Sequence, residues 1–392
     1  MNLHLKTFGC KVNQCETNDM VLQLSIAGCR ITQKPDNADT IIINSCTVTS
    51  NADRKTKQYL RRCLRCNPKA NIFLTGCLVD RQAKELKKEF PGVNLFINSK
   101  KPNIVKALGI LQSTVARGEM QPSFLGHTRA FVKIQDGCNG RCSYCVVPKV
   151  RQELWSKNTE DVILEAKNYV KAGHKEIVLC GIRLGKYKST ADLIDLIKKL
   201  EGIKGLYRIR LSSIELNDIT DSLIGLMSKS SKFCHHLHIP LQSGDDTILK
   251  DMNRPYNTSK FFNKIKNIRK KVPDVGLTTD IIIGYPTDTD KTLNGSYYFV
   301  KKCAFSRLHI FKFSRRPGTK ANLIGKDCPQ ALAKKWQGKF KYLDSELRKK
   351  FFKKFSNKKM EILTEENGYG YTSNYLYLKL PGKFAENEII NI

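Results

Sequence analysis

The chain has 392 residues, of which 68 are Lys or Arg and 36 are Asp or Glu, so its formal net charge is +32. A charged fraction of 27% beside 41% hydrophobic residues excludes a disordered, collagenous or coiled-coil chain, and the length predicts two to three domains. No apolar run reaches the ~18 residues of a membrane span, and charged residues interrupt the N-terminal segment. We therefore expect no signal peptide, no membrane partner and a cytoplasmic location.

The excess positive charge is concentrated in one part of the chain. Residues 301–360 contain 19 Lys and Arg but only 3 acidic residues, which is half of the total excess. The last 32 residues carry Lys379 and Lys383 against five Glu. A uniform preference for lysine would not produce this distribution. The pattern indicates a polyanionic partner, and nucleic acid is the expected one.

The first 112 residues read as a small parallel α/β domain of flavodoxin-like type. Short apolar runs at 3–8, 40–44, 71–75 and 94–97 predict strands, and the stretches 16–27 and 53–65 predict helices between them. Cys10, Cys46 and Cys77 each follow one of these strands. Ligands gather at the carboxyl ends of strands in open α/β sheets, so these three residues could converge there.

The segment at 113–127 shows no clear strand or helix pattern, and it is the predicted linker to a second strand–helix series. This series predicts a partial (β/α)6, TIM-like barrel over 128–350. Its expected strands lie near 130–135, 176–181, 207–212, 236–242, 276–284 and 307–313, and charge-rich helices follow at 330–354. Strand-like pieces within 351–392 predict a short C-terminal β-barrel.

The segment IQDGCNGRCSYCVVP contains the most informative motif of the chain. Cys138, Cys142 and Cys145 form C-x-x-x-C-x-x-C directly after the first expected barrel strand. Three thiolates on one loop can hold three irons of a 4Fe-4S cluster and leave the fourth iron without a protein ligand. S-adenosylmethionine can chelate that open iron. Structural zinc requires four ligands, and no fourth Cys or His lies at ligand spacing, so zinc is disfavoured.

Residues 130–320 resemble the radical S-adenosylmethionine superfamily, and the whole chain resembles its methylthiotransferase family. The matching stretches are KTFGCKVNQCET, INSCTVTSNADRK, LTGCLVDRQ, IQDGCNGRCSYCVVPKVR, HHLHIPLQSGDDTILKDMNR, TTDIIIGYP and LHIFKFSRRPGTKA. The resemblance implies a second 4Fe-4S cluster on Cys10, Cys46 and Cys77. It also implies a TRAM-like RNA-binding domain at 351–392.

The motif G-C-K-V-N-Q at 9–14, followed by Glu16-Thr17, resembles the corresponding motif of the threonylcarbamoyladenosine branch of this family. That branch methylthiolates C2 of N6-threonylcarbamoyladenosine beside the tRNA anticodon. The anticodon stem-loop is thus the expected partner, with an electron donor of flavodoxin or ferredoxin type. Methylthiolation of isopentenyladenosine or of a ribosomal-protein aspartate remains an alternative, as does a non-catalytic Fe-S protein that binds RNA.

Several further residues are candidates for cofactor or RNA binding, and no catalytic side chain is assigned. The family resemblance implies that the loop around Gly181 lines the S-adenosylmethionine pocket, although its glycines could equally be turn residues. Polar groups at or near the ends of the other barrel strands are expected to contact the ribose, amino group or carboxylate of this cofactor. These candidates are Gly181, Ser212, Gln242 and Asp280. Arg315 and Arg316 open the basic stretch and are expected to bind RNA phosphates, because a guanidinium binds phosphate through two nitrogens.

Other conspicuous residues receive a structural interpretation. Cys63 and Cys66 form C-x-x-C on a basic helix, and we interpret them as incidental packing or surface cysteines. Cys15 lies beyond Cys10 and is not expected to be a ligand. The motif HHLH at 235–238 is interpreted as barrel-interior histidines in preference to metal ligands.

Overall fold

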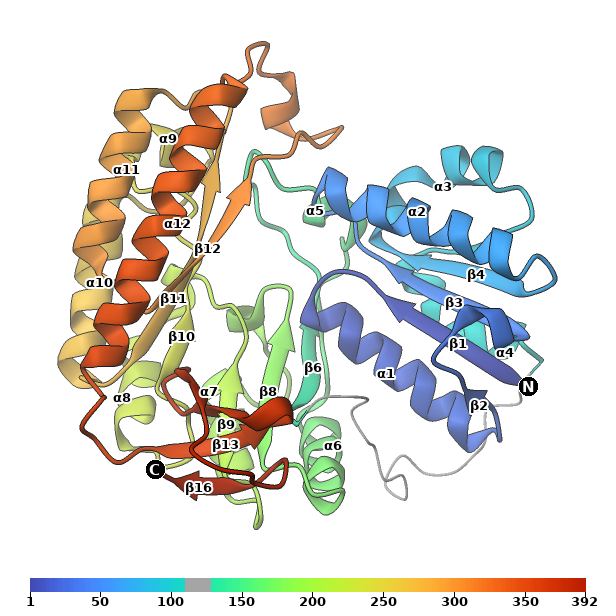
Figure 1. Cartoon of the computed structure of the whole chain (residues 1–392), viewed down its shortest axis with the longest axis horizontal. Coiled ribbons are helices and arrows are strands. Elements are labelled where there is room, and N and C mark those ends of the chain that lie inside the picture. Colours follow the sequence, from blue (N-terminus) through green and yellow to red (C-terminus); the bar gives the residue numbers. More distant parts are fainter. Residues whose placement is uncertain (110–127) are drawn as a thin grey trace.

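The computed structural model describes residues 1–109 and 128–392. In chain order it contains a parallel α/β domain, a strand–helix barrel and a small antiparallel sheet (Figure 1). The predicted linker at 113–127 lies outside the described residues. Within the described residues, no helix combines the length and the apolar character that a membrane crossing needs.

The N-terminal domain is a five-stranded parallel sheet in the order β2-β1-β3-β4-β5, which confirms the flavodoxin-like prediction. The strands are β1 (Asn2–Thr7), β2 (Arg30–Ile31), β3 (Thr40–Ser45), β4 (Asn71–Gly76) and β5 (Asn94–Phe96). The helices are α1 (Lys11–Ile26), α2 (Ser50–Cys66), α3 (Cys77–Glu89) and α4 (Ile104–Ala107). All six residues of β3 are buried, as expected for a strand covered on both faces.

Six parallel strands form the partial barrel, as predicted. They are β6 (Ala130–Asp136), β8 (Glu176–Gly181), β9 (Arg208–Leu211), β10 (His236–His238), β11 (Gly276–Ile283) and β12 (Arg307–Lys312). Two sheets, β7-β6-β8-β9 and β10-β11-β12, are joined by the parallel bridges Ile209–Phe233 and Ser213–His238. The short β7 (Trp155–Ser156) pairs antiparallel to β6.

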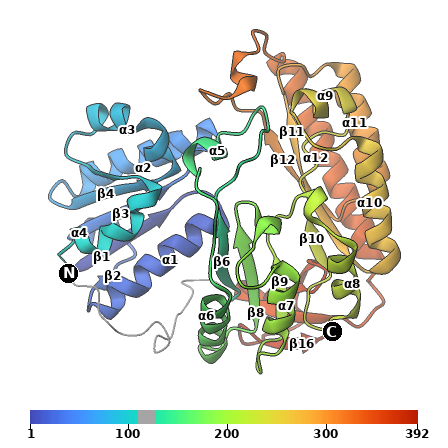
Figure 2. The ribbon, with the colours of Figure 1, turned by 180° about the vertical axis from the view of Figure 1, so that it is seen from behind.

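Amphipathic helices cover the outside of the barrel (Figure 2). They are α6 (Thr159–Lys171), α7 (Leu193–Glu201), α8 (Asp221–Lys229), α10 (Thr258–Lys271), α11 (Asp290–Cys303) and α12 (Gln330–Lys353). Two short helices, α5 (Val147–Val150) and α9 (Asp246–Asp251), lie in loops after strands. Because α12 runs to Lys353, it passes through the expected domain boundary at 350/351.

The C-terminal segment forms a four-stranded antiparallel sheet in the order β15-β14-β13-β16. Its strands are β13 (Glu361–Glu365), β14 (Tyr369–Thr372), β15 (Tyr377–Lys379) and β16 (Ile389–Asn391). It packs on the N-terminal ends of the barrel strands, where Arg208 donates to the Tyr371 carbonyl at 2.7 Å and Arg210 donates to that of Ser373 at 2.9 Å. This sheet therefore lies opposite the strand ends that lead into the cysteine loop.

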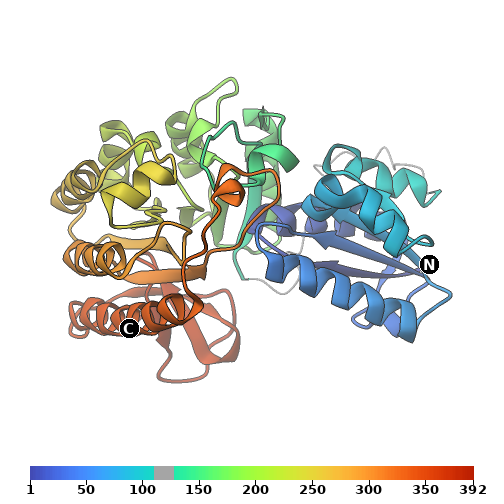
Figure 3. The ribbon, with the colours of Figure 1, turned by 90° about the horizontal axis from the view of Figure 1, so that it is seen from above.

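Helix α1 joins the N-terminal domain to the barrel, and the two lie side by side (Figure 3). Val12 and Cys15 belong to the same buried cluster as the β6 residue Phe131. The Cys15 thiol donates to the Phe131 carbonyl at 3.4 Å, and the Asn18 amide donates to the Tyr169 hydroxyl at 2.9 Å. Cys15 is thus a packing residue of the domain interface.

Candidate functional site

Cys10, Cys46 and Cys77 lie at the carboxyl ends of the neighbouring strands β1, β3 and β4. Cys10 precedes α1, Cys46 follows β3 directly, and Cys77 is the first residue of α3. Burial raises the pKa of the Cys46 thiol to about 12, and the adjacent thiols of Cys77 and Cys10 add to this rise. The three cysteines therefore lie within electrostatic range of one another, at the edge of the sheet where the strand order reverses and where this fold places ligands.

Two glycines allow these loops to approach each other. Gly9 has φ +108°, and a Cβ atom on it would lie 2.6 Å from the Cβ of Cys46. Gly76 has φ +98°, and its Cβ would lie 2.3 Å from the carbonyl oxygen of Ser45. Both positions need the left-handed backbone and the small size of glycine.

Asn13 holds the Cys10 and Cys46 loops together. Its buried side-chain amide donates to the carbonyl of Phe8 at 2.8 Å and to that of Ser45 at 2.9 Å. Phe8 and Ser45 are the residues that lead into Gly9-Cys10 and Cys46. One amide group therefore fixes the separation of two cysteine-bearing loops.

Cys138, Cys142 and Cys145 lie on the loop between β6 and α5. The Cys138 N–H donates to the Arg151 carbonyl at 3.1 Å, and the Gly140 N–H donates to the Cys138 sulfur at 3.2 Å. Burial raises the pKa of the Cys145 thiol to about 12, and the Cys142 and Cys138 thiols contribute to the rise. The three thiols are therefore close enough to influence one another's ionisation.

Two residues from other loops support the barrel cysteines. The Arg254 guanidinium donates to the Cys142 sulfur at 3.1 Å and to Glu215 at 2.5 Å. Ser143 bonds through its hydroxyl to that of Tyr285 at 2.9 Å. A buried guanidinium beside a sulfur stabilises the thiolate form that a metal needs.

Cys77 lies beside α5, the short helix that follows the Cys138–Cys145 loop and lies between the barrel and the N-terminal domain (Figure 1). Cys77 packs against Val146 and Val150 in one buried cluster. The Asn98 amide donates to the Val150 carbonyl at 3.2 Å and lies 3.6 Å from the Cys77 sulfur. The loop that follows Cys145 is therefore in direct contact with the N-terminal group.

A buried ion network connects the same two loops. Glu16 of α1 accepts from Arg151 at 2.8 Å and forms ion pairs with Lys101 and Lys133. Burial by itself would raise the pKa of Glu16, but these three cations hold that pKa well below its usual range. Arg151 also donates to the Asn13 side chain at 2.8 Å. Arg151 thus touches the Cys138 loop through its carbonyl and the Cys10 loop through its guanidinium.

Three of the four expected cofactor residues lie at or after the carboxyl ends of barrel strands, and the fourth lies within a strand. Gly181 ends β8, while Ser212 and Gln242 are buried just after β9 and β10. The Ser212 hydroxyl has no hydrogen-bond partner among the described residues. Asp280 lies within β11 and faces His238, with 3.1 Å between the carboxylate oxygen and Nε2. Three of the four therefore line the end that carries the cysteine loop, and Asp280 lies deeper.

Arg315 and Arg316 do not present free guanidiniums to RNA. Arg316 is 5% exposed and donates to Asp53 at 2.7 Å and to the Thr47 carbonyl at 3.0 Å. Arg315 donates to Asp327 at 2.7 Å and to several carbonyls of the loop that follows. The expectation that Arg316 contacts RNA phosphates is therefore wrong, because its guanidinium is buried in the domain interface, where it binds Asp53 and the Thr47 carbonyl.

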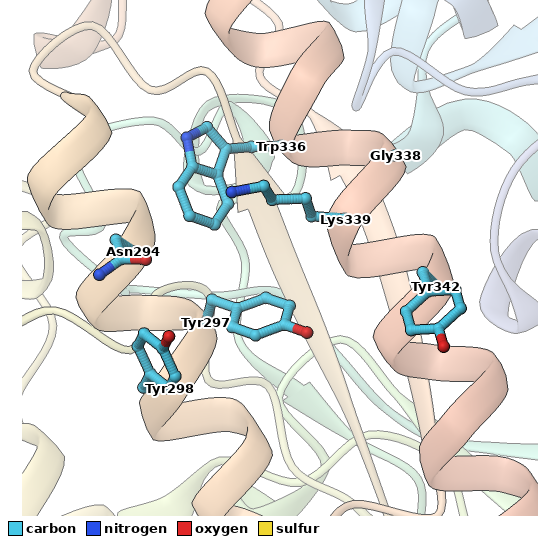
Figure 4. Close-up of a pocket in the computed structure, with 7 residues that line it drawn as sticks. All are labelled: Asn294, Tyr297, Tyr298, Trp336, Gly338, Lys339 and Tyr342. Atoms are coloured by element: carbon cyan, nitrogen blue, oxygen red, sulfur yellow. The ribbon is translucent and has the colours of Figure 1, made fainter.

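A pocket of about 410 Å³ lies between α11 and α12 (Figure 4). Its lining combines the exposed rings of Tyr298 and Tyr342 with more buried rings and a lysine. The full lining is Asn294, Tyr297, Tyr298, Trp336, Gly338, Lys339 and Tyr342. The Lys339 ammonium lies 4.1 Å from the centre of the Trp336 ring. This surface belongs to the basic stretch that the composition singled out.

The cysteine pair on α2 has a packing role, as interpreted from the sequence. Cys63 is fully buried in the core of the N-terminal domain, whereas Cys66 is exposed. Their side chains therefore face different environments. Asn13, Glu16, Arg151 and Arg254 were not singled out from the sequence, because each acts through a partner far away in the chain.

Both the N-terminal domain and the barrel match known protein families. Residues 2–98 match an uncharacterized protein family, UPF0004, and residues 132–299 match the radical SAM superfamily. Among solved structures, the radical S-adenosylmethionine methyltransferase TsrM from Kitasatospora setae has a TM-score of 0.60 at 10% identity. That similarity covers 82% of this chain and 77% of that one, and it concerns the fold.

Curated relatives match nearly the whole chain. The threonylcarbamoyladenosine tRNA methylthiotransferase MtaB of Bacillus subtilis is 34% identical over 96% of this chain and 89% of its own length. MtaB of Thermotoga maritima is 36% identical over 93% and 86%. A tRNA-2-methylthio-N(6)-dimethylallyladenosine synthase of Endomicrobium trichonymphae is 35% identical over 84% and 80%. With such identities over such lengths, the chain belongs to the family of radical S-adenosylmethionine tRNA methylthiotransferases.

Proposed function

We propose that this protein methylthiolates C2 of N6-threonylcarbamoyladenosine beside the anticodon of tRNA. One 4Fe-4S cluster is assigned to Cys10, Cys46 and Cys77, and the other to Cys138, Cys142 and Cys145. The observation that carries the assignment is the contact of Cys77 with Val146 and Val150, because these valines belong to the segment that directly follows Cys145. Three sulfurs in each group suit a cluster with one open iron.

When bound, the clusters and S-adenosylmethionine supply a radical that removes hydrogen and a sulfur donor that replaces it. The chain's own residues orient these groups. Asn13 sets the distance between two sulfur-bearing loops, and Arg254 stabilises the charge on the Cys142 sulfur. Arg151 fixes the relative position of the two loops, because it bonds to both.

The substrate proposal is supported by the two MtaB relatives and by the G-C-K-V-N-Q wording around Cys10. A tRNA substrate also places the enzyme in the cytoplasm. An electron donor of flavodoxin or ferredoxin type completes the proposal. The relative named as a dimethylallyladenosine synthase makes an isopentenyl-type substrate the second candidate.

Nucleoside analysis of tRNA from a strain that lacks the gene tests the substrate. We expect loss of the 2-methylthio form of threonylcarbamoyladenosine and its return with the wild-type gene. Loss of only the isopentenyl-type nucleoside would instead support the second candidate. Persistence of both 2-methylthio nucleosides, in a strain without a duplicate enzyme, would reject the proposal.

Iron analysis of anaerobically reconstituted protein tests the ligand assignment. Two clusters correspond to about eight irons per chain. Cys46→Ala and Cys142→Ala are each expected to reduce this to about four, whereas Cys66→Ala should leave it unchanged because Cys66 is exposed on α2. A wild-type content of about four irons would contradict the two-cluster arrangement.

A further inference from the structure

A group of three polar side chains lies inside the barrel, below the residues that follow the strand ends. His238 of β10, Asp280 of β11 and His309 of β12 form this group, which we name the His–Asp–His cluster. The Asp280 carboxylate oxygen lies 3.1 Å from His238 Nε2 and 3.8 Å from His309 Nδ1. The two imidazole rings have centroids 5.1 Å apart. Three adjacent strands therefore direct hydrogen-bonding groups to one place.

Strand register shows which side of the sheet the cluster faces. Asp280 is paired with His309, and the flanking β11 residue Ile281 packs in the main core with the outer helices. Since neighbouring strand residues face opposite sides, Asp280 faces the barrel interior. The side chains of Asp280 and His309 remain 21% and 40% exposed. Solvent, and hence a ligand group, can reach them.

One member of the cluster is held in place while another is left without a partner. The Thr278 hydroxyl lies 2.9 Å from His238 Nδ1 and 3.1 Å from His236 Nε2. By contrast, the buried Nε2 of His309 has no hydrogen-bond partner among the described residues, and neither does the buried Ser212 hydroxyl. A buried polar atom without a partner is costly, so such atoms point to a ligand.

The charges around the cluster come from both domains. Burial lowers the pKa of His309 to about 4, and the neighbouring His238 lowers it further, while Asp280 raises it. Arg307 and Lys11 also act on His309 in the lowering direction. His309 is therefore neutral at physiological pH.

We propose that the His–Asp–His cluster binds the threonylcarbamoyl substituent of the substrate adenosine. This inference rests on the proposed function and adds the subsite that reads the substituent. That group carries a carboxylate, a hydroxyl and a urea-like amide. Arg307 lies two residues before His309 on the same face of β12 and supplies positive charge for the carboxylate. His309 and Asp280 supply acceptors and donors for the hydroxyl and the amide N–H.

The same subsite disfavours an isopentenyl substituent. An apolar group placed there would bury His309 and Asp280 without new hydrogen bonds, and the protein would pay that desolvation cost. Sites built to form hydrogen bonds with a substrate discriminate strongly against analogues that lack the polar group. The cluster therefore contributes to specificity between the two classes of modified adenosine.

The test measures binding of the anaerobically reconstituted holoenzyme to anticodon stem-loops by fluorescence anisotropy. Three RNAs are compared, with threonylcarbamoyladenosine, isopentenyladenosine or adenosine at the modified position. We expect His309→Leu to weaken binding of the threonylcarbamoyl RNA by about tenfold and to change binding of the unmodified RNA less than twofold. His309→Gln should restore part of the loss. His235→Leu, a histidine outside the cluster, is the matched control.

Equal weakening of all three RNAs by His309→Leu would overturn the inference, as would full retention of the preference. Two histidines and a carboxylate could also hold a divalent metal. Metal analysis that finds one stoichiometric non-iron metal in the wild type, lost in His309→Leu, would assign the cluster to that metal and reject the inference.

The outcome also separates this inference from the proposed function. Wild-type holoenzyme that fails to methylthiolate any threonylcarbamoyl RNA would reject the function itself. Wild type that modifies this RNA, while His309→Leu keeps the full binding preference, would reject the subsite alone.

Discussion

Gly9 determines how closely the Cys10 and Cys46 loops can approach. An alanine there would place its Cβ 2.6 Å from that of Cys46 and would keep an unfavourable φ of +108°. We expect Gly9→Ala to lose the N-terminal cluster, so that iron falls from about eight to about four per chain. Iron analysis after reconstitution measures this loss.

Gly28→Ala is the matched control for Gly9→Ala. Gly28 also has a positive φ, +79°, but a Cβ atom there would meet nothing within 4 Å. This control carries the backbone strain without the steric contact. Retention of about eight irons by Gly9→Ala, or an equal loss in Gly28→Ala, would contradict the assigned role of Gly9.

Asp288 gives the protein a pH-dependent stability that is independent of the cysteines. Burial raises the pKa of its carboxyl to about 7, although the N–H groups of Gly284 and Tyr285 donate to it and act in the opposite direction. The folded state therefore holds a proton that the unfolded chain releases near pH 4. The contribution of Asp288 to the free energy of unfolding therefore falls as the pH rises from about 4 to about 7, and it is constant above about pH 7.

Asp288→Asn removes this proton while keeping an oxygen that can accept both N–H groups. We expect the variant to gain stability relative to wild type as the pH rises from about 5 to about 8, by about 1–4 kcal/mol. Denaturant unfolding at several pH values measures the difference. Asp290→Asn is the control, because hydrogen bonds from Lys335 and Trp336 lower the pKa of Asp290. A constant difference for Asp288→Asn across this range would refute the prediction.

At the scale of single elements, α12 carries the positive charge that points to RNA. It is a 24-residue helix whose inner face, including Trp336 and Phe340, is buried against the barrel. Lys339 and Lys341 are both exposed on α12, and Lys339 lines the aromatic pocket shared with α11. Lysines beside exposed rings can contact phosphates while the rings stack on bases.

Reversing charge on α12 tests this role. We expect Lys339→Glu combined with Lys341→Glu to weaken tRNA binding by about tenfold. The slope of log affinity against log salt concentration should become shallower by about the amount that one to two phosphate contacts contribute. Affinity measured over a range of salt concentrations gives both quantities. Lys198→Glu, on α7 and paired with Asp195, is the control. An unchanged affinity and salt dependence would remove α12 from the RNA-binding surface.

At the scale of the whole molecule, buried charges hold the two large units together. Asp53 of α2 binds both Arg81 of α3 and Arg316, which lies in the segment after β12. The three side chains are 13%, 10% and 5% exposed, so the ions are nearly dehydrated. Loss of one partner from such a group leaves uncompensated charge.

Arg316→Met is expected to destabilise the protein by about 2–4 kcal/mol, because Asp53 and the Thr47 carbonyl lose a buried donor. Hydrogen exchange of α2 should rise together with that of the segment after β12. Lys320→Met, an exposed neighbour, is the control. If Arg316→Met instead weakened RNA binding without any loss of stability, the sequence-based assignment to RNA would be restored.

The sequence by itself determined the strand–helix order and the Cys138, Cys142 and Cys145 trio. Both depend on local spacing: apolar runs bounded by turns predict the strands, and a short motif keeps its three sulfurs on one loop. The charge-rich helices expected at 330–354 are a single helix, α12, over Gln330–Lys353. The two-residue β2, the helix α3 and the final β16 were not foreseen. Short elements such as β2 and β16 have too few residues to show a periodicity.

Only the tertiary structure decided which distant residues meet. Cys10, Cys46 and Cys77 converge because the sheet order places β1, β3 and β4 side by side. Arg316 is buried because the segment after β12 contacts α2, 263 residues earlier in the chain. The C-terminal sheet closes the barrel opposite the cysteine loop through contacts such as that of Arg210 with Ser373. Such contacts depend on the packing of whole elements, and no local pattern of residue types encodes them.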